Sequence, residues 1–178
     1  LVNISHGDLI VAAAYLSWTA VQVTGLHPLL CVIIAVPIAA AFGYIVQRGI
    51  LNRTLGKDIL PPLLVTFGLS VIIQNGLLQS FSADSRKLDA GWLETKSFEL
   101  LPGVAVGLFP ILIFAAAVAT IWALQHMFYK TKLGRAFRAT SDDPEIAQLM
   151  GLDNRKVYAQ AMAICFGVVA LAGVFFAI

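Results

Sequence analysis

The segment GLFPILIFAAAVATIWALQHMF, from Gly107 to Phe128, is the clearest indication of the fold class. It contains no Lys, Arg, Asp or Glu. Its length suits the roughly 20 apolar residues that a helix needs to cross a bilayer. Four further apolar segments lie along the chain, at about Leu9–Val23, Pro28–Val46, Leu60–Phe81 and Val157 to the C-terminus. They predict an all-α, polytopic membrane helix bundle with about five transmembrane segments, in a single domain over residues 1–178.

The composition supports this class of protein. The chain is 59% hydrophobic and 12% charged, whereas soluble domains are about 45–50% apolar and about 25% charged. The apolar excess is therefore expected to face lipid or other membrane helices. The segment Leu9–Val23 is short, so we expect it to be tilted, broken or only partly inserted. Because the chain starts at Leu1 and ends in an apolar run, we expect a fragment that is incomplete at both ends.

Lys and Arg in the three longer loops predict the orientation of the bundle. The loops Gln47–Ile59 and Tyr129–Lys156 hold nine basic residues together, and Ser82–Val106 holds three. Cytoplasmic loops of membrane proteins carry the excess of Lys and Arg. We therefore expect the first two of these loops, and the residues before Leu9, on the cytoplasmic side, and Ser82–Val106 outside.

Small residues recur every four positions in three of the apolar segments. This spacing lets membrane helices approach closely, so we expect these stripes to pack against other helices rather than contact a ligand. The stripes are Ala35, Ala39 and Gly43; Ala115, Ala119 and Ala123; and Ala159, Ala163 and Gly167. Cys31 and Cys165 lie in apolar runs without disulfide or metal-ligand spacing, and we expect them to act as small apolar side chains.

The cytoplasmic loop 129–156 contains the signals of one short, capped helix. Asp143 and Pro144 read as an N-cap followed by proline at the first helical position, and Glu145 follows in the first turn. Gly151 is a natural terminator. A helix of about seven residues is not stable alone in water. It must therefore pack on its own bundle or dock into a groove on another protein.

The same helix carries a motif that resembles a known family. Glu145, Ala147 and Gly151 match the E-x-A-x-x-x-G loop of ABC importer permeases. Thr131–Ala139, just before it, resembles the segment that leads into this loop in branched-chain amino-acid ABC permeases. Two more stretches resemble the same family, namely Asn3–Asp8, with its N-x-x-H-G pattern, and Leu63–Ser70 with Gln74 and Asn75. The resemblance covers nearly the whole chain, and its motifs occur in the family's order.

The resemblance implies a mechanism and a set of partners. It implies that the short helix couples the membrane domain to a separate ATPase, with Asp143, Pro144, Glu145, Ala147 and Gly151 at the contact. It further implies ATP-binding subunits at the cytoplasmic face, a second permease subunit, a periplasmic or extracellular substrate-binding protein and a bacterial inner-membrane location. The chain has no G-x-x-x-x-G-K-[ST] loop, so ATP would be hydrolysed by a partner. We expect no catalytic residues, metal, cofactor or nucleic-acid partner.

Polar residues inside the membrane segments are the candidates for a substrate path. One set precedes the first segment: Asn3, Ser5, His6, Gly7 and Asp8. Gly7 after His6 suggests a broken helix, whose exposed end meets a zwitterionic substrate; alternatively, Asn3 and His6 only cap the helix. The other set lies on Leu60–Phe81: Thr66, Ser70 and Gln74, spaced four apart on one face, with Asn75 beside them. These side chains line a path or form interhelical hydrogen bonds.

The sequence thus indicates a permease subunit of an ABC importer for branched-chain or other hydrophobic amino acids. Related permeases for urea or short amides resemble the chain across the same motifs and stay open as an alternative. A channel or secondary transporter without an ATPase is the alternative from another class, and it would make the short cytoplasmic helix dispensable. A purely structural membrane scaffold is disfavoured, because it does not need the polar stripe on Leu60–Phe81.

Overall fold

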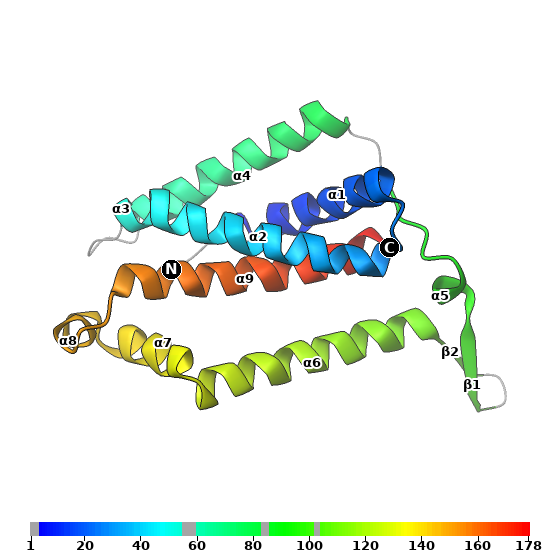
Figure 1. The fold of residues 1–178 in the computed structure, drawn as a ribbon. Helices are drawn as coiled ribbons and strands as arrows, with labels where there is room; N and C mark the ends of the chain where they lie inside the picture. The colour runs from blue at the N-terminus through cyan, green and yellow to red at the C-terminus, as the bar shows by residue number, and fades with distance from the viewer. Residues whose placement is uncertain (1–3, 55–59, 83–85, 102–103) are drawn as a thin grey trace. The chain divides into compact units, whose positions relative to one another are not determined.

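Long helices dominate the computed structural model, which describes residues 4–54, 60–82, 86–101 and 104–178 (Figure 1). Four helical stretches are long and apolar enough to cross a membrane: Pro28–Thr54, Leu60–Phe81, Leu108–Lys130 and Asn154–Ala177. They coincide with four of the five predicted segments, and the all-α membrane bundle is confirmed. The remaining predicted segment, Leu9–Val23, lies within helix α1, His6–Thr24. This helix is not among the candidate spans of the described residues.

The chain divides into two compact units, Leu1–Leu88 with Asp153–Ile178, and Asp89–Leu152. The helices of the first unit are α1 (His6–Thr24), η1 (Pro28–Cys31), α2 (Val32–Val46), η2 (Gln47–Leu51), α3 (Asn52–Thr54), α4 (Leu60–Phe81) and α9 (Asn154–Ala177). The second unit holds α5 (Trp92–Thr95), β1 (Ser97–Leu101), β2 (Val104–Gly107), α6 (Leu108–Lys130), α7 (Lys132–Asp142) and α8 (Pro144–Leu149).

Helices α2 and α9 pack closely and antiparallel through the predicted small residues. A Cβ atom added to Gly43 of α2 would lie 2.7 Å from the Cγ atom of Phe166 of α9. Toward the other end of the contact, Gly167 faces Val36 of α2. Ala35 and Ala159 are also almost completely buried. The packing role predicted for the stripes on these two helices is therefore confirmed.

Helix α1 runs parallel to α9 and starts halfway along it. The Nε2 atom of His6 lies 3.2 Å from the Sγ atom of Cys165, which is at mid-length of α9 (Asn154–Ala177). Further along, Gly173 of α9 packs on Ala13 of α1. If α9 spans the bilayer, α1 therefore begins near the midplane. The expectation that the residues before Leu9 lie near the cytoplasmic side stays a prediction, and the contact of His6 with the middle of α9 favours a deeper position for the start of α1.

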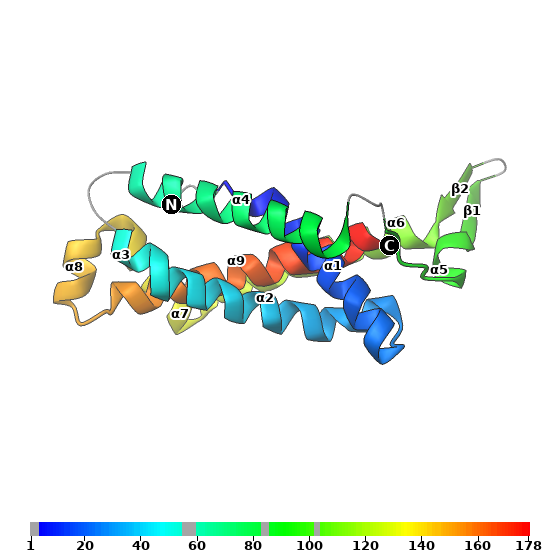
Figure 2. The ribbon, with the colours of Figure 1, turned by 90° about the horizontal axis from the view of Figure 1, so that it is seen from above.

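Helix α4 lies along α1 and also runs parallel to it (Figure 2). The two helices meet at Asp8 and Ser70. They meet again at Tyr15 and Phe81, whose rings stack with centroids 4.6 Å apart. A core cluster of Leu9, Val46, Leu51, Met162 and Phe166 joins the helices of this unit, and Val65, Leu69 and Ile73 of α4 pack against it.

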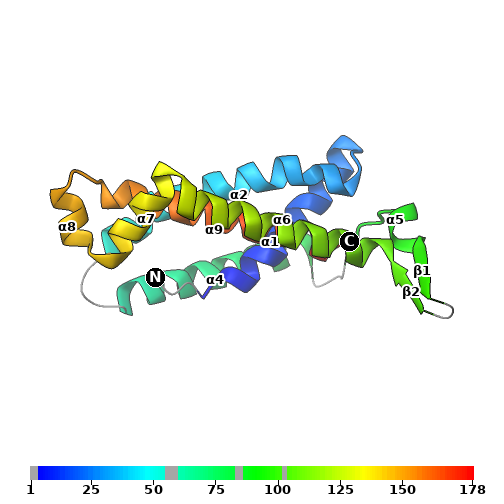
Figure 3. The same cartoon turned by 90° about the horizontal axis from the view of Figure 1, so that it is seen from below.

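The second unit is built around the long helix α6, with the hairpin β1–β2 before it and α7 and α8 after it (Figure 3). The antiparallel hairpin pairs Ser97 with Gly107 and was not predicted from the sequence. Helix α7 was not predicted either. Helix α6 has no buried residue, and its stripe of Ala115, Ala119 and Ala123 is exposed. The packing expected for that stripe is therefore not seen in the described residues.

Candidate functional site

A polar cluster joins the two sets of predicted path residues at the middle of α4. Asp8, in the first turn of α1, accepts a hydrogen bond from the Ser70 hydroxyl and a second, of 2.8 Å, from the Gln74 side-chain amide. The amide nitrogen of Gln74 also lies 3.4 Å from the Ser70 Oγ atom. Because Ser70 and Gln74 are one helical turn apart, both reach the same carboxylate. The sequence predicted both sets but not their contact.

Thr66 fastens the stretch before α1 to α4. Its hydroxyl donates to the Leu63 carbonyl oxygen at 3.0 Å, and its Oγ1 atom lies 3.4 Å from the backbone nitrogen of Ile4, which donates to it. Thr66 and Ser5 are both buried, at 2% and 0% exposed. These contacts position the start of α1, and thereby Asp8, against α4.

The other predicted path residues lie apart from this cluster. His6 is directed to Cys165 of α9. Gly7 lies inside the first turn of α1, so the predicted interruption at this residue is wrong. The Asn75 side-chain amide donates to the Val71 carbonyl oxygen of its own helix at 2.8 Å. Asn3 lies outside the described residues.

A groove of about 420 Å³ opens beside the carboxylate. This volume is within the roughly 300–1,000 Å³ of typical small-molecule sites. Asp8 and Gln74 form its polar end, and its other lining residues are Val11, Tyr15, Leu77, Leu78 and Ser82. Sequence reasoning missed these five, although helical spacing from Asp8 leads to Val11 and Tyr15, and from Gln74 to Leu77 and Leu78.

The short helix α8 is capped as predicted. The Asp143 side chain accepts hydrogen bonds from the backbone N–H groups of Glu145 and Ile146, at 2.9 and 3.0 Å. Pro144 occupies the first helical position. At the other end, Gly151 has φ +87° and donates to Gln148, while Leu152 donates to Ala147. This pair of bonds is the Schellman motif, for which glycine in the left-handed conformation is best suited.

One side of α8 packs inward and the other is open. Ala147 is 3% exposed, whereas Ile146, Leu149 and Met150 are 58%, 86% and 80% exposed. Glu145 is exposed as well. The apolar face that the sequence predicted is therefore split, with only its smallest member buried. A helix that is fixed at both ends and exposes large apolar side chains is suited to docking.

Helix α7 supports α8 and turns sharply away from α6. The Thr131 hydroxyl donates to the Met127 carbonyl oxygen at 2.6 Å and accepts from the Gly134 backbone nitrogen at 3.1 Å. A Cβ atom at Gly134 would lie 2.3 Å from the Phe128 carbonyl oxygen. The corner between the two helices therefore depends on glycine at this position.

No group of three or more His, Cys, Asp or Glu residues that could hold a metal ion occurs in the described part of the chain. The site is instead a carboxylate with two neutral hydrogen-bond donors, beside a largely apolar groove. Asp8 and Gln74 would be costly to expose to lipid, so they must face protein or a water-filled path. Membrane-spanning helices with such a cluster at mid-length define a multi-pass membrane protein.

Comparison with known proteins gives the family. The whole chain, residues 1–178, matches the family described as "Branched-chain amino acid transport system / permease component". The chain belongs to this family.

Curated relatives are similar over nearly the whole chain. The high-affinity branched-chain amino acid transport system permease protein BraD of Pseudomonas aeruginosa is 25% identical over 98% of the chain and 60% of BraD. LivH of Salmonella typhimurium, with the same description, is 23% identical over 98% of the chain and 60% of LivH. The fructose import permease protein FrcC of Rhizobium meliloti is 26% identical over 97% of the chain and 47% of FrcC. The chain thus spans about 60% of the length of the first two relatives. No solved structure matches it.

Proposed function

We propose that the chain is the membrane-spanning part of an ABC importer subunit that moves branched-chain or other hydrophobic amino acids across the bacterial inner membrane. Residues 1–178 act as a single permease domain, and residues 129–156 form its cytoplasmic coupling loop. ATP is hydrolysed by partner subunits that bind this loop. An extracellular or periplasmic binding protein delivers the substrate, and a second permease subunit completes the path.

The open face of α8 is the observation that carries this proposal. Asp143, Pro144 and Gly151 fix the backbone of the helix, and Ala147 anchors it inward. Leu149 and Met150 are left at least 80% exposed. In the proposed mechanism, closure of the ATPase subunits pushes on this face. A rigid helix transmits the push to the membrane helices, which switch between outward-facing and inward-facing states.

The groove beside Asp8 suits a hydrophobic amino acid. No salt bridge to Asp8 occurs among the described residues, so its charge can pair with the ammonium group of a substrate. Val11, Leu77 and Leu78 offer an apolar wall for the side chain. Ser70 and Gln74 hold the carboxylate. Buried Ser5 and Thr66 position the start of α1, with Thr66 accepting from Ile4. His6, Gly7 and Asn75 were also predicted at the path and have no role in this arrangement, and Asn3 stays a predicted path residue outside the described ranges.

A polar substrate is the second candidate. FrcC is described as a fructose import permease protein, and sugar hydroxyls would also hydrogen-bond a carboxylate and an amide. Urea and short amides have the same hydrogen-bonding chemistry. Uptake of labelled leucine in competition with leucine, urea and fructose separates these substrates. Inhibition by urea or fructose alone would contradict the amino-acid proposal.

The coupling role is tested by Leu149→Glu in the full-length subunit. A charge on the open face should abolish co-purification of the ATPase subunits and ATP-driven uptake, because it would be buried unpaired at the contact. Gln148→Glu adds the same charge to the neighbouring exposed position and is the matched control. Full uptake by Leu149→Glu would favour a channel or secondary transporter that needs no ATPase.

A further inference from the structure

A second polar pocket lies at the other end of the first unit, where α2 continues into η2 and α3 and where α9 begins. Its volume is about 340 Å³. It brings together residues about one hundred positions apart in the sequence. The lining residues are Arg48, Asn52, Arg53, Asp153, Arg155 and Lys156. Nothing in the proposed transport path uses them.

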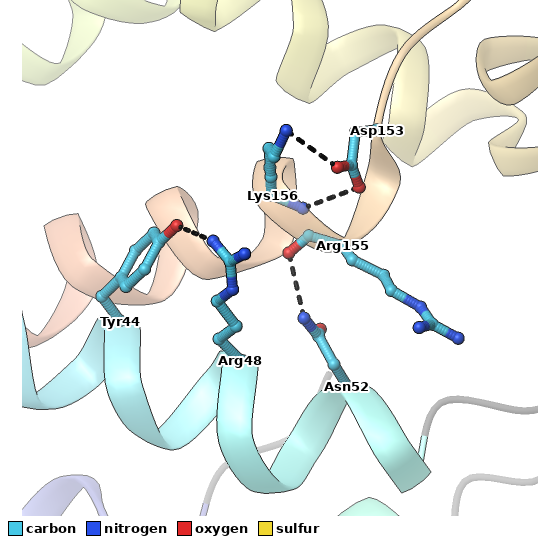
Figure 4. A network of polar contacts seen from close by, with 6 residues as sticks. All are labelled: Tyr44, Arg48, Asn52, Asp153, Arg155 and Lys156. Atoms are coloured by element: carbon cyan, nitrogen blue, oxygen red, sulfur yellow. Dashed lines mark hydrogen bonds and ion pairs between the residues drawn. The ribbon is translucent and has the colours of Figure 1, made fainter.

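Two hydrogen bonds of Asn52 fix the floor of this pocket, and Figure 4 shows the one to Arg155. Asn52 is 7% exposed, and its side-chain amide donates to the Arg155 carbonyl oxygen at 3.1 Å. Its Oδ1 atom accepts from the side chain of Gln47, which is completely buried, at 3.1 Å. The end of η2 is thereby tied to the first turn of α9. The backbones that carry the cationic side chains are held in place, while the side chains themselves are exposed.

The pocket has an excess of positive charge. It holds four cationic side chains and one carboxylate, Asp153, which pairs with Lys156 at 3.3 Å. The backbone N–H group of Lys156 donates to Asp153 and lowers the pKa of that carboxyl, which is therefore ionised at neutral pH. The guanidinium groups of Arg53 and Arg155 have no ion-pair partner in the described ranges. Among the described lining residues, three positive charges thus remain unbalanced, and they favour an anion.

The position of the pocket indicates which anion. It lies where two candidate spans, Pro28–Thr54 and Asn154–Ala177, end and begin. On the adjoining turns, Ile45 and Ile50 are 65% and 49% exposed. The Tyr44 hydroxyl accepts a hydrogen bond of 2.7 Å from the Arg48 guanidinium, and tyrosines are common at a membrane interface. An anionic phospholipid has both complementary parts: its phosphate would meet the cationic side chains, and its acyl chains would meet the exposed Ile45 and Ile50.

We propose that this pocket binds the phosphate group of an anionic phospholipid from the cytoplasmic leaflet. Arg53 and Arg155 bind the phosphate oxygens through their planar forks. Arg48 and Lys156 add charge at the two sides, and Asn52 keeps the floor in place. Basic pockets between membrane helices on the cytoplasmic side are suited to anionic headgroups. An acidic segment of a protein partner would have the same charge, but the position of the pocket at the ends of two candidate spans favours a lipid.

The test counts phospholipids retained by the full-length subunit. The subunit is purified in detergent with phosphatidylglycerol or with phosphatidylcholine, and bound lipid is counted by native mass spectrometry. We expect one tightly held phosphatidylglycerol that phosphatidylcholine does not replace. The double variant Arg53→Gln with Arg155→Gln should lower its affinity roughly 10- to 30-fold, since each basic residue near an anionic surface contributes several-fold. Both substitutions leave the Asn52 bond to the Arg155 backbone intact.

Lys130→Gln with Arg138→Gln removes the same number of charges outside the pocket and should leave lipid retention unchanged. In the unaltered subunit, high salt should weaken retention, because exposed charges are screened. Unchanged retention in the pocket variant would overturn the proposal. Displacement by glycerol phosphate at the same phosphate concentration would overturn it in favour of a soluble phosphate. Normal lipid retention with loss of the ATPase subunits would overturn it in favour of a protein partner.

Discussion

Asp8 is the residue on which the proposed path depends. Its carboxylate is held by two neutral donors, Ser70 and Gln74, rather than by a cation. Such donors fix the orientation of a carboxylate but leave its charge uncompensated, so a cationic substrate group gains from approaching it. An ion pair with a basic side chain would instead neutralise the carboxylate, and a cationic substrate group would gain nothing from approaching it. The arrangement therefore favours a binding role over a purely structural one.

Gln74 and Asn75 offer a paired test at this scale. Gln74 bonds Asp8, whereas Asn75 bonds the backbone of its own helix. Hydrogen bonds to charged groups contribute about 1.5–3 kcal/mol. We expect Gln74→Ala to lower leucine uptake by roughly 10-fold or more, and Asn75→Ala to leave it near wild type. Equal losses in both variants, measured at matched subunit levels in the membrane, would argue against a path through this cluster.

At the scale of an element, Gly134 and Thr131 determine the corner between α6 and α7. A Cβ atom at Gly134 would clash with the backbone of Phe128, which cannot move aside as a flexible side chain could. The hydrogen bonds of Thr131 at the same corner set the direction in which α7 leaves α6. Helix α8 follows α7 directly, so the position of the open face of α8 depends on this corner.

Gly134→Ala is therefore expected to destabilise the subunit by about 1–3 kcal/mol, the usual cost of overpacking. Thermal unfolding of the detergent-purified subunit measures the effect. Gly76→Ala is the control, because a Cβ atom at Gly76 meets nothing within 4 Å and alanine is the better helix former. An unchanged melting temperature for Gly134→Ala would show that the corner accommodates a Cβ atom without strain.

Sequence patterns predicted the elements whose signals are local. Helix α4 spans Leu60–Phe81, as its apolar run predicted, and α8 has the predicted caps. Helix α7 was missed because it has few apolar residues; its buried positions, Gly134, Phe137 and Thr140, recur only every three residues. The hairpin β1–β2 was missed because its strands are only five and four residues long, which is too short for a clear alternation of apolar and polar residues.

Contacts between helices could not be predicted from these local sequence patterns. The bond between Asp8 and Ser70 joins residues 62 positions apart, and it depends on the register of α1 against α4. Likewise, the point along α9 at which α1 begins is seen only from the contact of His6 with Cys165. The first segment was recognised as short, but only this contact shows that its start lies at mid-length of a spanning helix.

At the scale of the first unit, helix directions agree with the predicted topology. Helices α1, α4 and α9 run parallel, and α2 runs antiparallel to them. Ser70 and Cys165 are each at mid-length of a candidate spanning helix. In the proposed orientation, with the basic end of α9 in the cytoplasm, the Asp8 cluster would therefore lie near the midplane. Substrate sites of alternating-access transporters lie near the midplane, so this position fits the proposed function.

ATP-driven uptake of labelled leucine tests the central claim most directly. The full-length subunit, as wild type or Asp8→Asn, is reconstituted into vesicles with the proposed ATPase subunits, second permease subunit and substrate-binding protein. The asparagine keeps the size of the side chain and can still accept a hydrogen bond, but it removes the charge. We predict that Asp8→Asn assembles normally with the ATPase subunits and loses at least roughly 10-fold in uptake, as expected for loss of a charged contact. Uptake at the wild-type rate would contradict the account.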